Sequence, residues 1–208
     1  MATQALNVGY FITGDVGDDA PNAHSQASGT VNSTGGAQPT AMQYFQSSER
    51  DSTFRYTRTF LNFDTSGITG TTGTVTLSIP GNVNSDTQVY AIKSTHSTPI
   101  LASGDDFNNI DLSTPYSSAT DWGTSVNTIT LNADAVGQIE NEDDFNVALL
   151  IKDDVLNTEE PLEEDGDLAC GINFSGAITI NYTAAAVTPP YISFNSGKYK
   201  ITSGKIKI

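Results

Sequence analysis

The sequence predicts an all-β fold: a jelly-roll-like antiparallel β-sandwich with one short helix and a small C-terminal three-stranded β annex. Threonine, serine, asparagine and glycine are abundant in the 208 residues, and only 16% of residues are charged. Roughly nine short segments have the alternation or the β-branched and aromatic content of strands, separated by turn signals. Helix-forming sequence is confined to one segment, so a sandwich explains the pattern best.

The first quarter of the chain combines strand signals with a low-complexity segment. Leu6–Ile12 is predicted to be a strand, and Met42–Phe45 and Phe54–Phe63 follow as two more. Between them, Gly14–Thr40 is rich in glycine, serine and asparagine without periodicity, which favours disorder or a long functional loop held by neighbouring subunits. Apolar residues in the third strand do not keep strict parity, so we expect a bulge near Arg58–Thr59.

The middle of the chain contains three segments typical of half-buried strands. Gly73–Ile79 alternates cleanly and is expected to end at Pro80-Gly81. Thr87–Ser94 and Val126–Leu131 are predicted to be further strands. The intervening residues, Thr95–Thr124, are interpreted as a long connection.

One segment, Asn132–Glu140, has the features of a short helix. Asn132 is a suitable N-cap residue, because its side-chain oxygen can accept a hydrogen bond from a backbone N–H of the first turn. Val136 and Ile139 share one face of the predicted helix. Gly137 lowers helix propensity, so the helix is expected to have only two or three turns.

The remainder of the body is predicted to contain three strands and two connections. Asn146–Lys152 is mostly apolar, as a central strand would be, and Leu168–Phe174 and Ala177–Tyr182 are the last two strands. Asp153–Asp167 is expected to be an acidic loop. Ala184–Pro190 is a linker that its two prolines hold extended.

The last eighteen residues form the predicted annex. Tyr191–Phe194, Lys198–Ile201 and Lys205–Ile208 are short alternating segments separated by three-residue loops that end in Ser-Gly. In register, one face carries Ile192, Phe194, Tyr199, Ile201, Ile206 and Ile208, and the other carries Lys198, Lys200, Lys205 and Lys207. So small a sheet cannot bury an apolar face alone, which predicts that another surface covers it.

The chain therefore divides into four parts. Residues 1–41 are an N-terminal strand and a Gly/Ser-rich arm, and residues 42–183 are the sandwich. Residues 184–190 are the linker, and residues 191–208 are a β meander for docking or assembly.

Charge is distributed unevenly along the sequence. Residues 1–197 contain all 24 acidic residues and five of the nine Lys and Arg, a net charge of −19. Residues 198–208 contain the other four lysines, a net charge of +4. An acidic body repels nucleic acid and anionic membranes, so we expect neither as a partner. A basic nucleic-acid-binding tail is the alternative for the C-terminus, but alternation with isoleucine fits a half-buried strand better.

Cysteine content and the chain termini bear on the compartment. Cys170 is the only cysteine, so we expect no intrachain disulfide, and its strand-like surroundings predict a small buried hydrophobic residue. The first residues lack the basic start and apolar run of a signal peptide. No segment approaches the ~20 apolar residues of a membrane-spanning helix. We expect a soluble protein made in the cytoplasm.

The block from Thr57 to Ile79 resembles the core signature of DNRLRE-type jelly-roll domains. The matching positions are Arg58, Phe60, Leu61, Phe63, Asp64, Ile68, Val75 and Leu77. A weaker likeness extends the resemblance over about residues 42–183. It implies a β-sandwich related to carbohydrate-binding modules of cell-surface proteins. The missing secretion signal and the C-terminal annex depart from that family, and suit the similar sandwiches of bacteriophage decoration, fibre and tail proteins.

Catalytic motifs are not evident. The two histidines, His24 and His96, lie in polar loop sequence, and neither belongs to a recognisable motif. A Cys170–histidine pair is conceivable in space, but burial of the cysteine is the better interpretation. We therefore expect a protein that is not an enzyme.

Calcium is the best cofactor candidate, because it takes several oxygen ligands that sandwich loops readily supply. Three acidic clusters qualify, although none has the spacing of a known calcium loop, and a solvated acidic loop is the alternative for each. The first contains Asp15, Asp18 and Asp19; the second contains Asp105 and Asp106; the third includes Glu163, Glu164, Asp165 and Asp167.

A sugar-binding surface would need an exposed aromatic ring beside amide or carboxylate groups. Trp122, next to Asp121 and near Tyr116, is the one such place. The alternative is that Trp122 covers the sandwich core.

The three arginines, Arg50, Arg55 and Arg58, are expected to pair with local acids such as Glu49 and Asp51. Exposed pairs of this kind add little stability.

Two functions remain. The first is a structural subunit of a bacteriophage virion, a decoration, fibre or tail protein, which binds copies of itself or other capsid or tail proteins through its terminal segments. The alternative is a carbohydrate-binding module that recognises glycans with the help of calcium.

Overall fold

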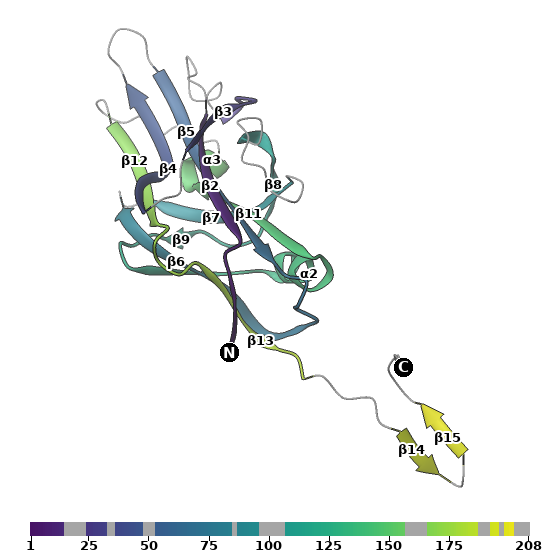
Figure 1. Ribbon diagram of the computed structural model, residues 1–208. Coiled ribbons are helices and arrows are strands. Elements are labelled where there is room, and N and C mark those ends of the chain that lie inside the picture. Colours follow the sequence, from purple (N-terminus) through teal and green to yellow (C-terminus); the bar gives the residue numbers. More distant parts are fainter. Residues whose placement is uncertain are drawn as a thin grey trace.

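The computed structural model describes residues 1–14, 24–32, 36–47, 53–84, 87–95, 107–156, 166–186, 192–195 and 198–201 (Figure 1). Its strands are β1 (Ala2–Ala5), β2 (Val8–Gly14), β3 (Gly29–Asn32), β4 (Ala37–Ser47), β5 (Thr53–Asp64), β6 (Thr71–Asn84), β7 (Gln88–Ser94), β8 (Ile110–Pro115), β9 (Thr120–Asp121), β10 (Val126–Thr130), β11 (Asp144–Ile151), β12 (Gly166–Asn173), β13 (Thr179–Ala184), β14 (Ile192–Asn195) and β15 (Lys198–Ile201). The helices are α2 (Ala133–Asn141) and α3 (Lys152–Leu156). The predicted all-β sandwich is confirmed.

The strands form two layers that meet along one side. The smaller layer has the order β1-β13-β6-β10. The larger layer contains β12-β4-β5-β11-β7-β8, with β2 paired to β5 and β3, and β9 paired to β7. All of these pairings are antiparallel. Pairing between β12 and β6 joins the two layers.

Strand β6 passes from one layer to the other at Pro80-Gly81. Before this point it pairs with β10 and β13 in the smaller layer, and from Gly81 to Asn84 it pairs with β12 in the larger one. The prediction that the strand ends at Pro80-Gly81 is therefore wrong. The dipeptide marks a corner, where a strand changes sheets through a bend.

Strand β5 is buried on both faces, which explains its lack of alternation. Every residue from Tyr56 to Phe63 is buried. Pairing with β2 and β11 runs without a register shift, so the bulge predicted near Arg58–Thr59 is absent. The irregularity lies instead in β12, where the register shifts between Cys170 and Ile172.

Three segments expected to be loops contain regular structure. Within Gly14–Thr40, β3 pairs with β2, and β4 begins at Ala37. The connection Thr95–Thr124 contains β8 and β9, both paired to β7. The expected acidic loop Asp153–Asp167 begins inside α3, where Asp153 and Asp154 are buried.

Helix α2 agrees with the sequence prediction. Asn132 caps it, and its Oδ1 atom accepts a hydrogen bond from the Ala135 backbone N–H at 3.1 Å. Ala135 and Ile139 are buried, whereas Val136 is only half-buried. In the part of the chain that the structure describes, neither helix has the length and apolar character to cross a membrane.

A single buried cluster takes side chains from both layers. Leu77 and Ile180 come from the smaller layer, and Phe60 and Phe145 come from the larger. Tyr10 stacks on Phe60 with ring centroids 5.4 Å apart. The core therefore holds the body together without a disulfide, and Cys170 is part of it as a free thiol.

Candidate functional site

The C-terminal hairpin, β14 with β15, has the predicted register pattern. Ile192 lies opposite Ile201 and Phe194 opposite Tyr199, two apolar pairs. These alternate with Ser193 opposite Lys200 and Asn195 opposite Lys198. The observed register therefore alternates apolar pairs with pairs that contain a lysine, as the sequence predicts.

The hairpin turn is shorter than predicted. Asn195 pairs with Lys198, so two residues connect the strands instead of three, and β14 extends to Asn195. Two-residue loops match the twist of the flanking strands, which favours this shorter connection. The third predicted strand, with Lys205, Ile206, Lys207 and Ile208, lies outside the described residues.

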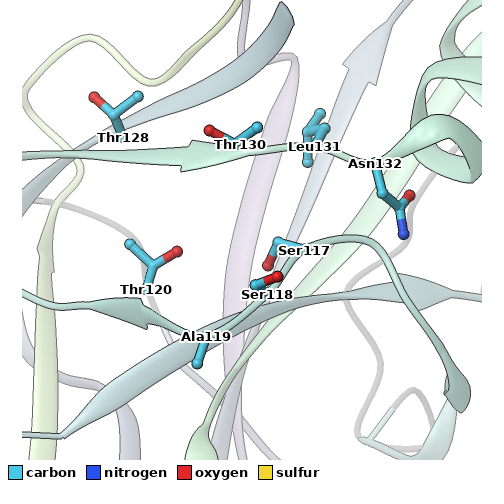
Figure 2. A pocket seen from close by; sticks show the side chains of 8 residues that line it. All are labelled: Ser117, Ser118, Ala119, Thr120, Thr128, Thr130, Leu131 and Asn132. Carbon is cyan, nitrogen blue, oxygen red and sulfur yellow. The ribbon is translucent and has the colours of Figure 1, made fainter.

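A groove lies between the smaller layer and the larger layer. Its walls are the end of β10 with the two residues that precede α2, and the Ser117–Thr120 segment that leads into β9 (Figure 2). The cavity has a volume of about 350 Å³. All the lining residues are uncharged, and most carry hydroxyl groups: Ser117, Ser118, Ala119, Thr120, Thr128, Thr130, Leu131 and Asn132.

The two aromatic rings of the predicted sugar-binding surface are not exposed. Trp122 is 3% exposed, and its Nε1–H donates a hydrogen bond to the Gly171 carbonyl oxygen at 3.1 Å. Tyr116 is 2% exposed and stacks on Phe145. The prediction of a ligand-binding pair of rings is therefore wrong for this structure, and the alternative that Trp122 covers the core is confirmed. Asp121 is exposed and accepts a hydrogen bond from Gln88 at 2.7 Å.

The phenol of Tyr116 reaches an acidic margin of the body. Its hydroxyl donates to Gln138 Oε1 at 2.6 Å. Burial, together with the nearby carboxylates of Glu142, Asp134 and Asp111, raises the pKa of Tyr116 to about 12. A phenol with so high a pKa stays protonated at neutral pH, so its role is that of a hydrogen-bond donor.

The candidate calcium ligands fall largely outside the described residues. This applies to Asp15, Asp18 and Asp19, to Asp105 and Asp106, and to Glu163, Glu164 and Asp165. Asp167 lies in β12, opposite Phe45 in the β4 ladder. Among the described residues, no group of three or more His, Cys, Asp or Glu could hold a metal ion. Calcium binding stays a prediction.

A buried polar cluster around Arg58 was not anticipated. Arg58 is fully buried, and its guanidinium makes two hydrogen bonds to Asp154, Nε to Oδ2 at 2.7 Å and Nη2 to Oδ1 at 2.6 Å. The expected pairing of Arg58 with exposed local acids is wrong, because its partner lies 96 residues away in α3. The only signal in the sequence was the position of this charged residue in the middle of a predicted strand, Phe54–Phe63, that is rich in aromatic residues.

The other Arg58 donors bind segments that connect strands. Nη1 donates to the Phe107 carbonyl oxygen at 2.9 Å and to Asn108 Oδ1 at 3.0 Å, and Nη2 donates to the His24 carbonyl oxygen at 3.0 Å. The guanidinium carbon also lies 4.1 Å from the centre of the Phe107 ring. Arg58 thus fastens two loop segments to the body, with all five N–H groups in use.

The two groups considered for catalysis are both bound into the structure. Burial raises the pKa of the Cys170 thiol to about 12, so the reactive thiolate is scarce at neutral pH. The Nε2 atom of His24 donates to the Asp154 backbone carbonyl oxygen at 2.8 Å, so this ring belongs to the Arg58 cluster. His96 lies outside the described residues.

In comparisons with known proteins, no protein family, curated protein or solved structure matches this chain. The resemblance to DNRLRE-type domains therefore stays a prediction.

Proposed function

We propose that this chain is a non-enzymatic structural subunit of a bacteriophage virion, a decoration, fibre or tail-associated protein that assembles through its C-terminal hairpin. The partners are copies of the same chain and neighbouring capsid or tail proteins. The observation that carries the proposal is the hairpin register, in which Ile192–Ile201 and Phe194–Tyr199 alternate with the lysine-containing pairs. The virion setting rests on the resemblance given by the sequence.

The hairpin supports assembly because it supplies two complementary interactions. A two-stranded sheet is marginal in water, so its apolar pairs gain stability from a covering surface. Residues 1–197 carry a net charge of −19, so the lysines favour a surface of the acidic body. The same chain therefore carries both halves of a heterologous contact, which generates rings or filaments.

The body supports the proposal as a rigid carrier. Arg58, Asp154, Trp122 and Tyr116 direct their polar atoms into internal hydrogen bonds. Because these polar side chains bond to other parts of the body, they hold its connecting segments in place and cover its core.

Deleting residues 191–208 tests the proposal. Among the described residues, β14 and β15 pair only with each other, so the deletion leaves every described ladder of the sandwich intact. We expect an unchanged melting temperature and a monomer in light scattering at concentrations where the full chain assembles. A truncated chain that assembles normally would overturn the proposal.

A full-length variant tests the contribution of the lysine charges without removing any residues. Lys198→Glu with Lys200→Glu keeps the alternation and removes the attraction to an acidic partner. The matched control is Lys198→Arg with Lys200→Arg. We expect the glutamate variant to be monomeric and the arginine variant to assemble like the wild-type protein.

A further inference from the structure

Strand β10 presents an open edge. In the described part of the chain it pairs with β6 and with no other strand. Val126 is 60% exposed, and Thr128 and Thr130 are exposed as well, whereas Asn127 and Ile129 are buried. The strand therefore lies at the margin of the smaller layer, with one face on the core.

The hydrogen-bond pattern shows which backbone groups this edge offers. Gly81 N–H donates to the Ser125 carbonyl oxygen at 2.6 Å, and Leu131 N–H donates to the Val75 carbonyl oxygen at 3.0 Å. Both bonds fit the register that places Ile129 opposite Leu77. Because bonded and non-bonded pairs alternate in an antiparallel ladder, the N–H and C=O groups of Val126, Thr128 and Thr130 point away from β6.

The groove shown in Figure 2 lies along this edge. The side chains of Thr128 and Thr130 turn away from Ser118 and Ala119 on the opposite wall. The lining residues are uncharged, so an extended chain could enter without desolvating a buried charge.

The edge lacks the features that normally prevent strand addition. Natural proteins protect edges with lysine, proline or bulges. Val126–Thr130 contains neither a charged residue nor proline, is rich in β-branched residues, and follows the β6 register without a shift.

We propose that the β10 edge is the acceptor site for the C-terminal hairpin of a second copy of this chain, which adds to the smaller layer as a further strand. The inference rests on the proposed function and names the surface at which the hairpin docks. Strand addition supplies backbone hydrogen bonds to the outward groups of Thr128 and its neighbours.

Charge and free edges identify the hairpin as the occupant. Two exposed carboxylates flank the groove-lining segments, Asp121 after Thr120 and Asp134 shortly after Asn132. Lys198 and Lys200 of an added hairpin complement them. Within the described residues, β14 and β15 have no neighbour beyond each other, so the hairpin has a free edge to offer.

Thr128→Pro tests the acceptor site, with Thr128→Val as the matched control. Proline removes an N–H that points away from β6, so the internal ladder keeps its bonds. We expect both variants to melt like the wild-type protein. The proline variant should self-associate about tenfold more weakly or worse, and the valine variant should be unchanged. A folded proline variant that assembles normally overturns the inference.

Cross-linking gives a second test that does not require proline to be tolerated. Copies with Thr128→Cys are mixed with copies with Ser193→Cys and treated with a short bismaleimide. Cys170 does not compete, because it is fully buried. We expect a cross-linked dimer only in the mixture, and none when Ser193→Cys is replaced by Ser66→Cys, an exposed position on the body. Equal yields with both partners overturn the inference.

The two proposals fail in different ways. If removal of residues 191–208 abolishes assembly while Thr128→Pro assembles normally, the hairpin docks elsewhere, and only the acceptor site is wrong. If the full-length chain remains monomeric at every concentration, self-assembly through the hairpin is wrong as well.

Discussion

Arg58 and Asp154 form a fully buried, two-point ion pair between the middle of the central strand β5 and the short helix α3. Both carboxylate oxygens are used, and the remaining Arg58 donors hold the His24 and Phe107 segments. The pair therefore fixes the position of two connecting segments on the body. The desolvation cost of burying two charges offsets much of their attraction, whereas removing one partner leaves the other charge buried and unpaired.

Asp154→Asn should destabilise the protein strongly. The substitution keeps the shape of the side chain but leaves the Arg58 charge buried without its partner, which costs about 3–5 kcal/mol. Urea unfolding measures this loss. Lys152→Met, which removes a charge from a less buried position of α3, should change stability by no more than about 0.5 kcal/mol. Equal effects of the two substitutions would contradict the structural role of the pair.

Trp122→Phe should cost about 1–3 kcal/mol, because the Gly171 carbonyl oxygen loses its donor while most of the ring packing is kept. Trp122 is the only tryptophan, so its fluorescence reports this site directly. We expect blue-shifted native emission that glycans leave unchanged and that moves to the red on unfolding. A saturable change on adding a glycan would restore the carbohydrate-binding alternative.

The sequence was most informative where local pattern and burial coincide. Thr87–Ser94 and Val126–Leu131 were predicted almost to the residue, because each is a strand with one face on the core. The helix was predicted because Asn132 supplies a cap that is visible locally.

The remainder depended on contacts between distant segments. Strand β3 begins at Gly29, a residue of the low-complexity segment. A Cβ atom at this position would overlap the Thr13 carbonyl oxygen, so the close packing of β3 against β2 requires a glycine there. Trp122 follows an exposed aspartate, and its ring is buried against a distant strand, where the Gly171 carbonyl oxygen accepts a hydrogen bond from its Nε1–H. The partner of Arg58 could not be identified, because sequence proximity favoured Glu49 and Asp51.

Stability should fall in alkaline solution. Burial raises the pKa of Cys170 from 9.0 to about 12, and that of Tyr116 rises from 10.0 to about 12. A raised pKa in the folded state means that the unfolded chain loses its proton first. The contribution of each group is therefore complete below about pH 9 and is lost as the pH rises toward 12.

The expected slope is at most about 1.4 kcal/mol per pH unit for each group. Urea unfolding at several pH values between 8 and 11 measures it, and Cys170→Ala should flatten the curve from pH 9 upward. In the wild-type protein, a thiol reagent should modify Cys170 only at the rate of unfolding. Rapid modification of the native protein would contradict the burial of this thiol.

Gly81→Ala should be among the most damaging small substitutions, because Gly81 occupies the corner where β6 changes layers. A Cβ atom there would overlap the Gly123 carbonyl oxygen and approach the buried Asn127 amide, which itself donates to that oxygen at 3.0 Å. Backbone on one side and a bonded amide on the other leave little room to relax, so we expect a loss of about 3 kcal/mol or more. Gly137→Ala is the control: its Cβ meets open space, and alanine favours the helix by about 0.5–1 kcal/mol. Thermal unfolding of the two variants should therefore shift in opposite directions, and a Gly81→Ala protein as stable as the wild type would show that the corner is not closely packed.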